Sequence, residues 1–135
     1  MEQNPNIVAL RHELHQNPEL SDQEHETAAI IRRFMSHYHP HKTTTGIGGT
    51  GIAFEYIGDN PGPTSLFRCE LDALPIQETN KLEYASIVDN VSHKCGHDGH
   101  MAIISYLAVL LSQHPVKNGR VVLLFQPAEE TGAGS

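Results

Sequence analysis

Apolar residues recur at helical spacing in the first part of the chain. Ile7, Leu10 and Leu14 follow one another at intervals of three or four residues, which places them on one face of an α-helix. Residues 17–20, Asn-Pro-Glu-Leu, bring a proline that interrupts the pattern. We therefore expect the first helix to end before this segment.

A second apolar stripe predicts another helix. Ser21 and Glu24 stand three residues apart, the spacing of a capping box in which a hydroxyl and a carboxylate close the start of a helix. The stripe that follows consists of Ala28, Ile31, Phe34 and Met35. We expect this helix to end near residues 37–40.

From about residue 51 onward, the spacing of apolar residues predicts three strands and one further helix. Residues 51–57 and 64–71 are rich in apolar and aromatic side chains, and a turn cluster at 58–63 separates them, so we expect two adjacent strands. An apolar helix is expected at about 99–113. The nearly continuous apolar run at 120–125 is typical of a strand buried on both faces. Strand, helix and strand in this order indicate a right-handed crossover in an α/β layer.

Composition narrows the class of protein. The chain has 135 residues, an ordinary size for one domain, and 39% of them are hydrophobic. Nine Lys and Arg against sixteen Asp and Glu give a net charge of −7, which argues against a nucleic-acid partner. The longest apolar stretch, 101–111, is about half of a bilayer span, and residues 1–5 lack the features of a signal peptide. We expect no membrane partner, a cytoplasmic location, and reduced thiols at Cys69 and Cys95.

Chemistry concentrates in two short segments. Residues 93–100 contain one thiol, three imidazoles and one carboxylate, and the acid pair Glu129-Glu130 follows the apolar run at 120–125. Thiolate, imidazole and carboxylate bind zinc and similar divalent ions, and a second acid beside a ligand can act as a general base. Asp72 and the acid pair each follow a predicted strand, where open α/β sheets keep their sites. The sequence therefore predicts a hydrolytic metal site.

Other interpretations of these residues stay open. Asp98 can orient a ligand histidine through a hydrogen bond or cap the helix that follows. Cys95 with His97 and His100 can form a catalytic thiol pair, which leaves the acid pair unexplained. The glycines at 46–51 have the spacing of a dinucleotide fingerprint, but a strand is expected after them and not a helix, so we reject a nucleotide site.

Four motifs give the chain a resemblance to a known family. They are Arg11-His12-Glu13-Leu14-His15 with Asn17-Pro18-Glu19-Leu20, then Phe67-Arg68-Cys69-Glu70-Leu71-Asp72-Ala73-Leu74-Pro75, then Cys95-Gly96-His97-Asp98-Gly99-His100, then Phe125-Gln126-Pro127-Ala128-Glu129-Glu130. Together they resemble the metal-dependent amidohydrolases of the aminoacylase and carboxypeptidase superfamily. Within it, the chain is most similar to the N-acyl-amino-acid amidohydrolases, the group that includes hippurate hydrolases and auxin-conjugate hydrolases.

The resemblance implies a function and a site. It implies that Cys95, His97 and Glu130 are metal ligands, that Glu129 is the general base, and that Asp72 has a supporting or orienting role. The substrate would be an N-acyl amino acid or a related small conjugate, whose amide bond is cleaved by a metal-activated water. The family uses two divalent ions, commonly zinc or manganese. Its catalytic domain is α/β, with a mixed, mostly parallel sheet flanked by helices, and it carries a smaller inserted dimerisation domain.

The chain departs from the family pattern in three residues and in length. Cys69 and Glu70 replace a small residue and an aspartate, and Lys94 replaces a small residue. Family members are considerably longer, and their later portion brings two further histidine ligands and the inserted domain. We therefore expect residues 1–135 to be the amino-terminal part of the catalytic domain. The complete protein would be a homodimer through the missing domain, and the chain by itself would be inactive. The alternative is a catalytically dead binding or interaction fragment of the same fold.

Overall fold

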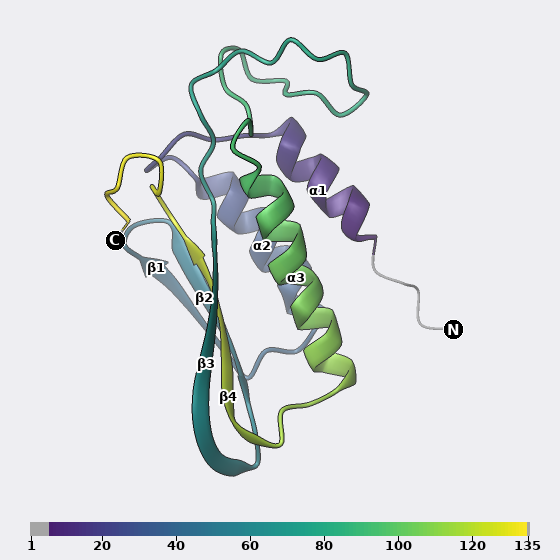
Figure 1. The fold of residues 1–135 in the computed structure, drawn as a ribbon, viewed down its shortest axis with the longest axis vertical. Helices are drawn as coiled ribbons and strands as arrows, with labels where there is room; N and C mark the ends of the chain where they lie inside the picture. Colours follow the sequence, from purple (N-terminus) through teal and green to yellow (C-terminus); the bar gives the residue numbers. More distant parts are fainter. Residues whose placement is uncertain (1–5, 135) are drawn as a thin grey trace.

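The computed structural model describes residues 6–134, so the amino terminus used for the signal-peptide prediction lies outside the described residues. The elements are α1 (Ile7–Gln16), α2 (His25–Ser36), β1 (Lys42–Ile47), β2 (Gly51–Ile57), β3 (Asn60–Glu70), α3 (His97–Gln113) and β4 (Asn118–Gln126). The strands form one sheet, and the three helices lie on one side of it (Figure 1). None of the described helices is long and apolar enough to cross a membrane.

Both predicted amino-terminal helices form, but the second is capped differently from the expectation. Glu24 precedes α2 and makes no side-chain cap hydrogen bond, and the Ser21 hydroxyl donates to Asp72 instead. The carboxylate of Glu19 accepts hydrogen bonds from the backbone N–H of Glu26 at 3.1 Å and of Thr27 at 2.7 Å. The capping box was therefore a wrong prediction, because a carboxylate from the preceding turn takes the free N–H groups of the helix.

The sheet has the order β1-β2-β4-β3, so the prediction that residues 51–57 and 64–71 form adjacent strands is wrong. Strand β4 lies between them, antiparallel to β2 and parallel to β3. The turn cluster carries the chain over the start of β4. A Cβ at Gly62 would lie 2.7 Å from the Gly119 nitrogen, and one at Gly119, where φ is +72°, would lie 2.0 Å from the Pro63 carbonyl. Glycine is needed here because two backbones cross almost in contact.

The predicted crossover forms, and the fold class is confirmed. Strand β3, helix α3 and parallel strand β4 follow one another as expected, within an α/β fold that has a mixed sheet and helices. Of the three strand pairings in the described part of the chain, only that of β3 with β4 is parallel. The expectation of a mostly parallel sheet therefore does not hold for these residues.

The polar strand β1 was not predicted. Its sequence, Lys-Thr-Thr-Thr-Gly-Ile, has no apolar alternation because the strand lies at the sheet edge and is largely exposed. The glycines at 46–51 make the turn from β1 to β2, with Gly46, Gly48 and Gly49 at positive φ. A strand and not a helix follows them, which agrees with the rejection of a nucleotide site.

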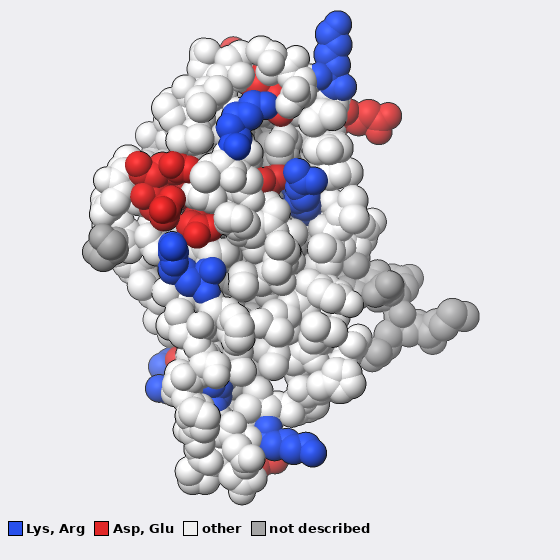
Figure 2. Space-filling view, in the orientation of Figure 1, with Lys and Arg blue, Asp and Glu red and all other residues white. Residues whose placement is uncertain are grey.

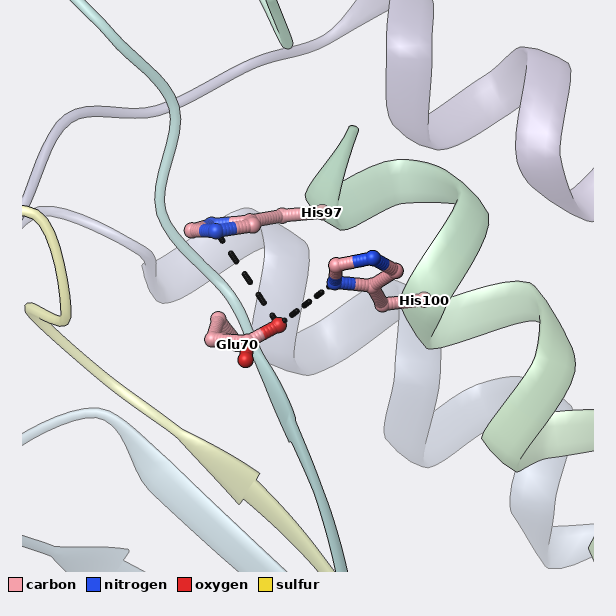
Figure 3. A group of neighbouring side chains, drawn as sticks. All are labelled: Glu70, His97 and His100. Atoms are coloured by element: carbon pink, nitrogen blue, oxygen red, sulfur yellow. Dashed lines mark hydrogen bonds and ion pairs between the residues drawn. The ribbon is translucent and has the colours of Figure 1, made fainter. Parts of the chain in front are cut away.

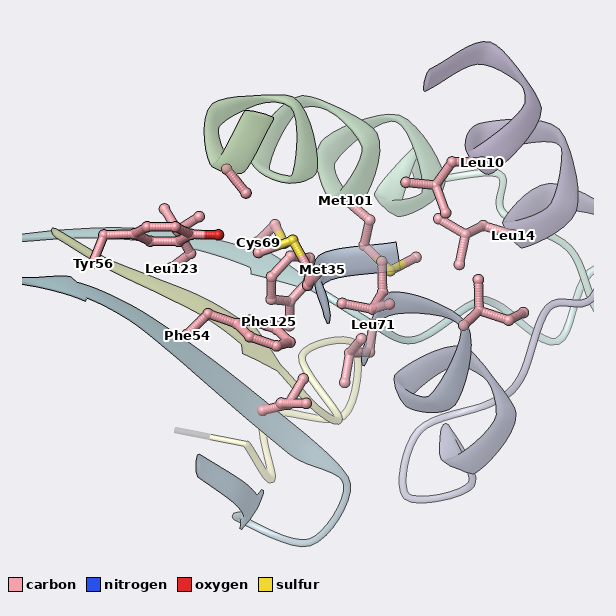
Figure 4. Close-up of a cluster of buried hydrophobic side chains, with 14 residues drawn as sticks. Leu10, Leu14, Met35, Phe54, Tyr56, Cys69, Leu71, Met101, Leu123 and Phe125 are labelled. Carbon is pink, nitrogen blue, oxygen red and sulfur yellow. The ribbon is translucent and has the colours of Figure 1, made fainter. Parts of the chain in front are cut away.

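The core lies between the sheet and the helices (Figure 4). Phe54 of β2 and Phe125 of β4 meet edge to face, with ring centroids 5.8 Å apart. In β4, Leu123 and Phe125 are fully buried, whereas Val122 and Leu124, which alternate with them along the strand, are only half-buried. Burial of this strand on both faces was a wrong prediction, since the helices cover only one side of the sheet.

Replacing Phe125 by alanine should lower the free energy of unfolding by about 3–5 kcal/mol, because a fully buried ring leaves a cavity at the centre of the core. Phe67→Ala is the matched control, since Phe67 lies on the neighbouring strand with 44% of its surface exposed. Urea-induced unfolding of both variants measures the difference. Equal losses in the two variants would contradict this placement of the core.

Candidate metal centre

Segments far apart in sequence meet at one end of the sheet. Because β3 and β4 are parallel, their carboxyl ends lie at the same edge, at the top in Figure 1. Asp72 follows β3, the pair Glu129-Glu130 follows β4, and Cys95 and His97 stand at the start of α3. Figure 2 shows acidic side chains gathered at this end, with lysine and arginine side chains around them. The structure thus brings together the residues that the sequence analysis assigned to one site.

His97 is oriented by Asp72. Its Nδ1 donates a hydrogen bond to the backbone carbonyl of Asp72 at 2.8 Å and lies 3.4 Å from the carboxylate oxygen Oδ1. A carbonyl only accepts, so Nδ1 carries a proton, and Nε2 is the nitrogen that has a lone pair when the ring is neutral. That nitrogen lies 3.6 Å from Glu129, 3.7 Å from Glu130 and 4.0 Å from Glu70, measured to the nearest carboxylate oxygen. Nε2 is therefore the ring nitrogen that faces the three carboxylates and that a metal ion would bind after its proton is lost.

The donor atoms fit a divalent cation. One donor atom each from Cys95, His97 and Glu130 lies within 4.8 Å of the others. The Glu130 oxygen Oε1 is buried and has no hydrogen-bond partner among the described residues. A buried carboxylate oxygen without a hydrogen bond is costly unless a positive charge lies near it, and this mixture of sulfur, nitrogen and oxygen donors suits zinc. These three residues could hold such an ion.

A second group of donors shares His97. Glu70, His97 and His100 also have donor atoms within 4.8 Å of one another, and His100 Nδ1 lies 2.8 Å from Glu70 (Figure 3). Neither Glu70 nor His100 was assigned a ligand role from the sequence. The available signal was position: Glu70 ends β3 two residues before Asp72, and His100 is one helical turn after His97.

The neighbouring carboxylates raise the pKa values of His97 and Cys95, so both groups keep their protons. Burial lowers the pKa of His97, but hydrogen bonds to Asp72 and the charge of Glu70 outweigh it and raise the pKa to about 9. Hydrogen bonding to Glu130, followed by burial, raises the pKa of the Cys95 thiol. A metal ion must displace these protons in order to bind, so affinity at this cluster should increase with pH.

Asp72 also anchors the acid pair. Its Oδ2 accepts hydrogen bonds from the Ser21 hydroxyl at 2.7 Å and from the Glu130 backbone N–H at 2.9 Å. Burial raises the pKa of Asp72, but these bonds and the one with His97 lower it well below its ordinary value. The carboxylate is therefore ionised. These contacts agree with the supporting role that the resemblance implied.

The side chain of Asp98 points away from this cluster. Its Oδ2 accepts from Arg11 Nε at 3.1 Å and lies 2.8 Å from His15 Nδ1. Asp98 therefore does not orient His97, and no side-chain hydrogen bond caps α3. The structure supports neither of the two roles considered for Asp98. It joins the first turn of α3 to α1.

A buried polar network holds the loop that carries Cys95. His15 Nε2 lies 3.2 Å from both carboxylate oxygens of Glu78, which also accept from Lys94 Nζ at 3.0 Å and from the Ser86 backbone N–H at 2.8 Å. His15 was assigned no role from the sequence. The missed signal was its helical spacing with Arg11, since both reach Asp98. Lys94 is paired with Glu78 in this network.

The two cysteines differ in environment. Both are free, as predicted. Cys69 is buried in the core, where burial raises the pKa of its thiol well above the ordinary value. Cys95 is exposed beside His97 and Glu130. Of the two, only Cys95 is available to the metal cluster.

An α/β sheet with thiol, imidazole and paired carboxylates at the ends of its strands is typical of metal-dependent hydrolases. Residues 66–135, more than half of the chain, match the family described as Peptidase family M20/M25/M40. The chain belongs to this family of metallopeptidase-like enzymes, which confirms the resemblance to metal-dependent amidohydrolases.

Individual relatives agree with this assignment. The chain is 42% identical over 130 residues to an N-acetylcysteine deacetylase of Bacillus subtilis, covering 96% of this chain and 34% of that protein. It is 39% identical over 129 residues to an N-acyl-L-amino acid amidohydrolase of Geobacillus stearothermophilus, covering 95% and 35%. A solved dinuclear metal-binding peptidase of the M20 family from Bacillus subtilis superposes with a TM-score of 0.89 at 43% identity, covering 95% and 36%. The chain spans about a third of the length of these relatives.

Acid should remove the contribution of Glu78 to stability. Burial raises the pKa of Glu78, but bonds from Ser86, Lys94 and His15 lower it from 4.5 to about 2. The ionised Glu78 carboxylate therefore stabilises the folded state. This stabilisation is fully present above the pKa that Glu78 has in the unfolded chain, and it is lost as the pH falls through the lower pKa that Glu78 has in the folded chain. We expect Glu78→Gln to cost up to about 3 kcal/mol at neutral pH and progressively less below pH 4.5. Urea unfolding at several pH values measures this, and a cost that does not change between neutral pH and about pH 3 would contradict it.

Proposed function

We propose that this chain is part of a metal-dependent hydrolase that cleaves the amide bond of N-acyl amino acids or related small conjugates. The observation that carries the proposal is the meeting of Cys95, His97 and Glu130 donor atoms within 4.8 Å, with Glu129 beside them. Two relatives whose names specify deacylation of N-acyl amino acids support the choice of substrate class. On this proposal, residues 1–135 form the amino-terminal part of the catalytic domain.

Cys95, His97 and Glu130 would hold the metal. A complete site would contain two divalent ions, zinc or manganese, and the dinuclear metal-binding relative supports the number. When bound, the ions would lower the pKa of a water molecule and polarise the amide carbonyl. The Asp72 carbonyl accepts from His97 Nδ1, so Nε2 is the nitrogen that would bind, and the Asp72 carboxylate fixes the backbone of Glu130.

Glu129 would be the general base. It is adjacent to Glu130 in sequence, but its side chain is more exposed, 38% against 21%, so a substrate can reach it. It would take the proton from the attacking water and deliver it to the leaving amine. A base of this kind contributes about 10²–10⁴-fold to the rate.

The surroundings of Cys95 disfavour a thiol hydrolase. A catalytic cysteine needs a lowered pKa, usually from a neighbouring cation, so that the thiolate forms near neutral pH. Glu130, burial and the further charges of Glu129 and Glu70 raise the pKa of Cys95 instead. Without a metal ion, this thiol is a poor nucleophile.

The remaining proposals rest on the sequence. The net charge of −7 argues against a nucleic-acid partner. The amidohydrolase relatives support a small-molecule substrate. A cytoplasmic location, the absence of a membrane partner and a homodimer of the complete protein stay predictions.

Metal content tests the ligand set. The purified protein should carry metal that a chelator removes, and Cys95→Ser and Glu130→Gln should each lower its metal affinity, because each removes a donor. Glu129→Gln is the matched control: it changes the adjacent carboxylate and should leave the metal content as in wild type. Elemental analysis before and after dialysis measures all four proteins. Absence of metal above background in wild type would overturn the proposed site, and equal loss in the control would overturn the division of roles between the two acids.

Activity tests the general base. The 135 residues alone should not hydrolyse an N-acyl amino acid, because their three proposed ligands do not complete a two-metal site. In a longer form of the protein that hydrolyses an N-acyl amino acid, Glu129→Gln should lower kcat by about 10²–10⁴-fold without loss of metal. Chromatographic detection of the released amino acid measures both. If the 135 residues hydrolyse the substrate and a chelator abolishes this activity, the predicted inactivity of the short chain is wrong. A longer form that neither binds metal nor cleaves the substrate would favour the alternative of a catalytically dead binding protein.

A further inference from the structure

Glu24 is a fully buried carboxylate that the proposed reaction does not use. We propose that Glu24 is a positioning residue. It holds the backbone that precedes Glu129 and Glu130, and the position of this backbone sets the direction from which the Glu130 carboxylate would bind the metal. The inference rests on the proposed function, because it concerns the same acid pair.

Glu24 connects three segments of the chain. Its Oε1 accepts a hydrogen bond from the Ala128 backbone N–H at 2.7 Å, and its Oε2 accepts one from the Thr50 hydroxyl at 2.8 Å. Glu24 immediately precedes α2, Thr50 lies in the turn from β1 to β2, and Ala128 immediately precedes Glu129. Each carboxylate oxygen of Glu24 thus accepts a hydrogen bond from a different segment of the chain.

Ala128 needs this partner. The residue is fully buried and has a φ of +49°, in the left-handed region that residues other than glycine rarely adopt. A buried backbone N–H without an acceptor is strongly disfavoured, and Glu24 supplies the acceptor. An unusual backbone conformation persists only where its surroundings fix it, and here a buried carboxylate does so.

The acid pair is therefore held from two sides. Glu24 fixes the N–H of Ala128 on one side of Glu129, and Asp72 fixes the N–H of Glu130 on the other. With the peptide group between Pro127 and Ala128 and that between Glu129 and Glu130 both held, the side chains of Glu129 and Glu130 leave the backbone in set directions.

The turn that carries Thr50 also packs against this segment. A Cβ at Gly51 would lie 2.8 Å from Pro127 Cδ, and one at Gly48 would lie 3.6 Å from Pro127 Cγ. The turn from β1 to β2 thus lies directly against the residue before Ala128. Glu24 links this turn to the acid pair by hydrogen bonds, in addition to the packing.

Helix capping and ion pairing do not explain Glu24. The side chain makes no cap hydrogen bond to α2, whose free N–H groups bond to Glu19 instead. No cation pairs with Glu24 in the ion pairs of the described residues. What remains is hydrogen bonding to two neutral donors, a task that depends on the reach of the side chain and not on its charge.

Cobalt binding tests the inference through variants that separate reach from charge. Glu24→Gln keeps an oxygen for the Ala128 N–H, and its amide can donate to Thr50. Glu24→Asp keeps the charge but is one methylene too short to bridge the same two groups. The probe is Co²⁺, titrated into metal-free protein and followed by the thiolate-to-cobalt absorption of Cys95 and the d–d bands, which report coordination geometry. Exchange of the Ala128 amide hydrogen is measured on the same proteins.

We expect Glu24→Gln to bind Co²⁺ as wild type does, and Glu24→Asp and Glu24→Ala to lose about 10–100-fold in affinity, the usual effect of removing a group that orients a ligand. The Ala128 amide should exchange faster in the two weak binders only. Glu19→Ala is the matched control, since it weakens the start of the same helix without touching the acid pair. It should lower Tm and leave Co²⁺ affinity and the d–d bands unchanged.

The outcomes are distinguishable. Wild-type protein that binds no Co²⁺ overturns the proposed function. Wild-type binding with equal affinities in the Gln and Asp variants overturns the positioning role, and so does faster Ala128 exchange in Glu24→Asp without a change in affinity. If Glu24→Ala does not fold, the comparison of Gln with Asp still decides.

Discussion

The site depends on the buried Asp72, which contacts three other segments. Its backbone carbonyl accepts from His97, and its carboxylate accepts from Ser21 and from the backbone of Glu130. These partners come from the start of α3, the turn before α2 and the segment after β4. Asp72 therefore orients a histidine through its backbone carbonyl and positions the Glu130 backbone through its carboxylate, and metal binding requires both.

The sheet supplies the other constraint. Parallel pairing of β3 with β4 brings Asp72 and the acid pair to one edge, and α3, which joins these strands, begins at that same edge with His97. The cluster is rich in negative charge, which alone would destabilise it. In the absence of metal, the proton that makes His97 cationic compensates part of that charge, and the proton on Cys95 keeps this thiol from adding to it. The same residues would exchange protons for a cation, so that binding and protonation compete.

The sequence revealed much of this arrangement, for physical reasons that also explain what it did not reveal. Helical periodicity located α1 and α2, and contiguous motifs carried the donor residues because each motif lies within one turn or loop. Strand β1 was missed because a polar edge strand has no apolar alternation. The order of β2 and β3 was missed because it depends on β4, which comes much later in the chain. The supporting contacts of His15 and Glu24 join residues 63 and 104 positions apart, a separation that no local pattern encodes.

The position of β4 in the middle of the sheet has a consequence for how the molecule folds. Strands β2 and β3 precede it in the chain but do not pair with each other, so their common neighbour must arrive before the sheet is continuous. The acid pair immediately follows that same strand. Pairings between distant parts of a chain form slowly, because they close long loops. The pairing of β4 thus completes both the continuous sheet and the group of Cys95, His97 and Glu130, and a nascent chain that stops before residue 118 lacks both.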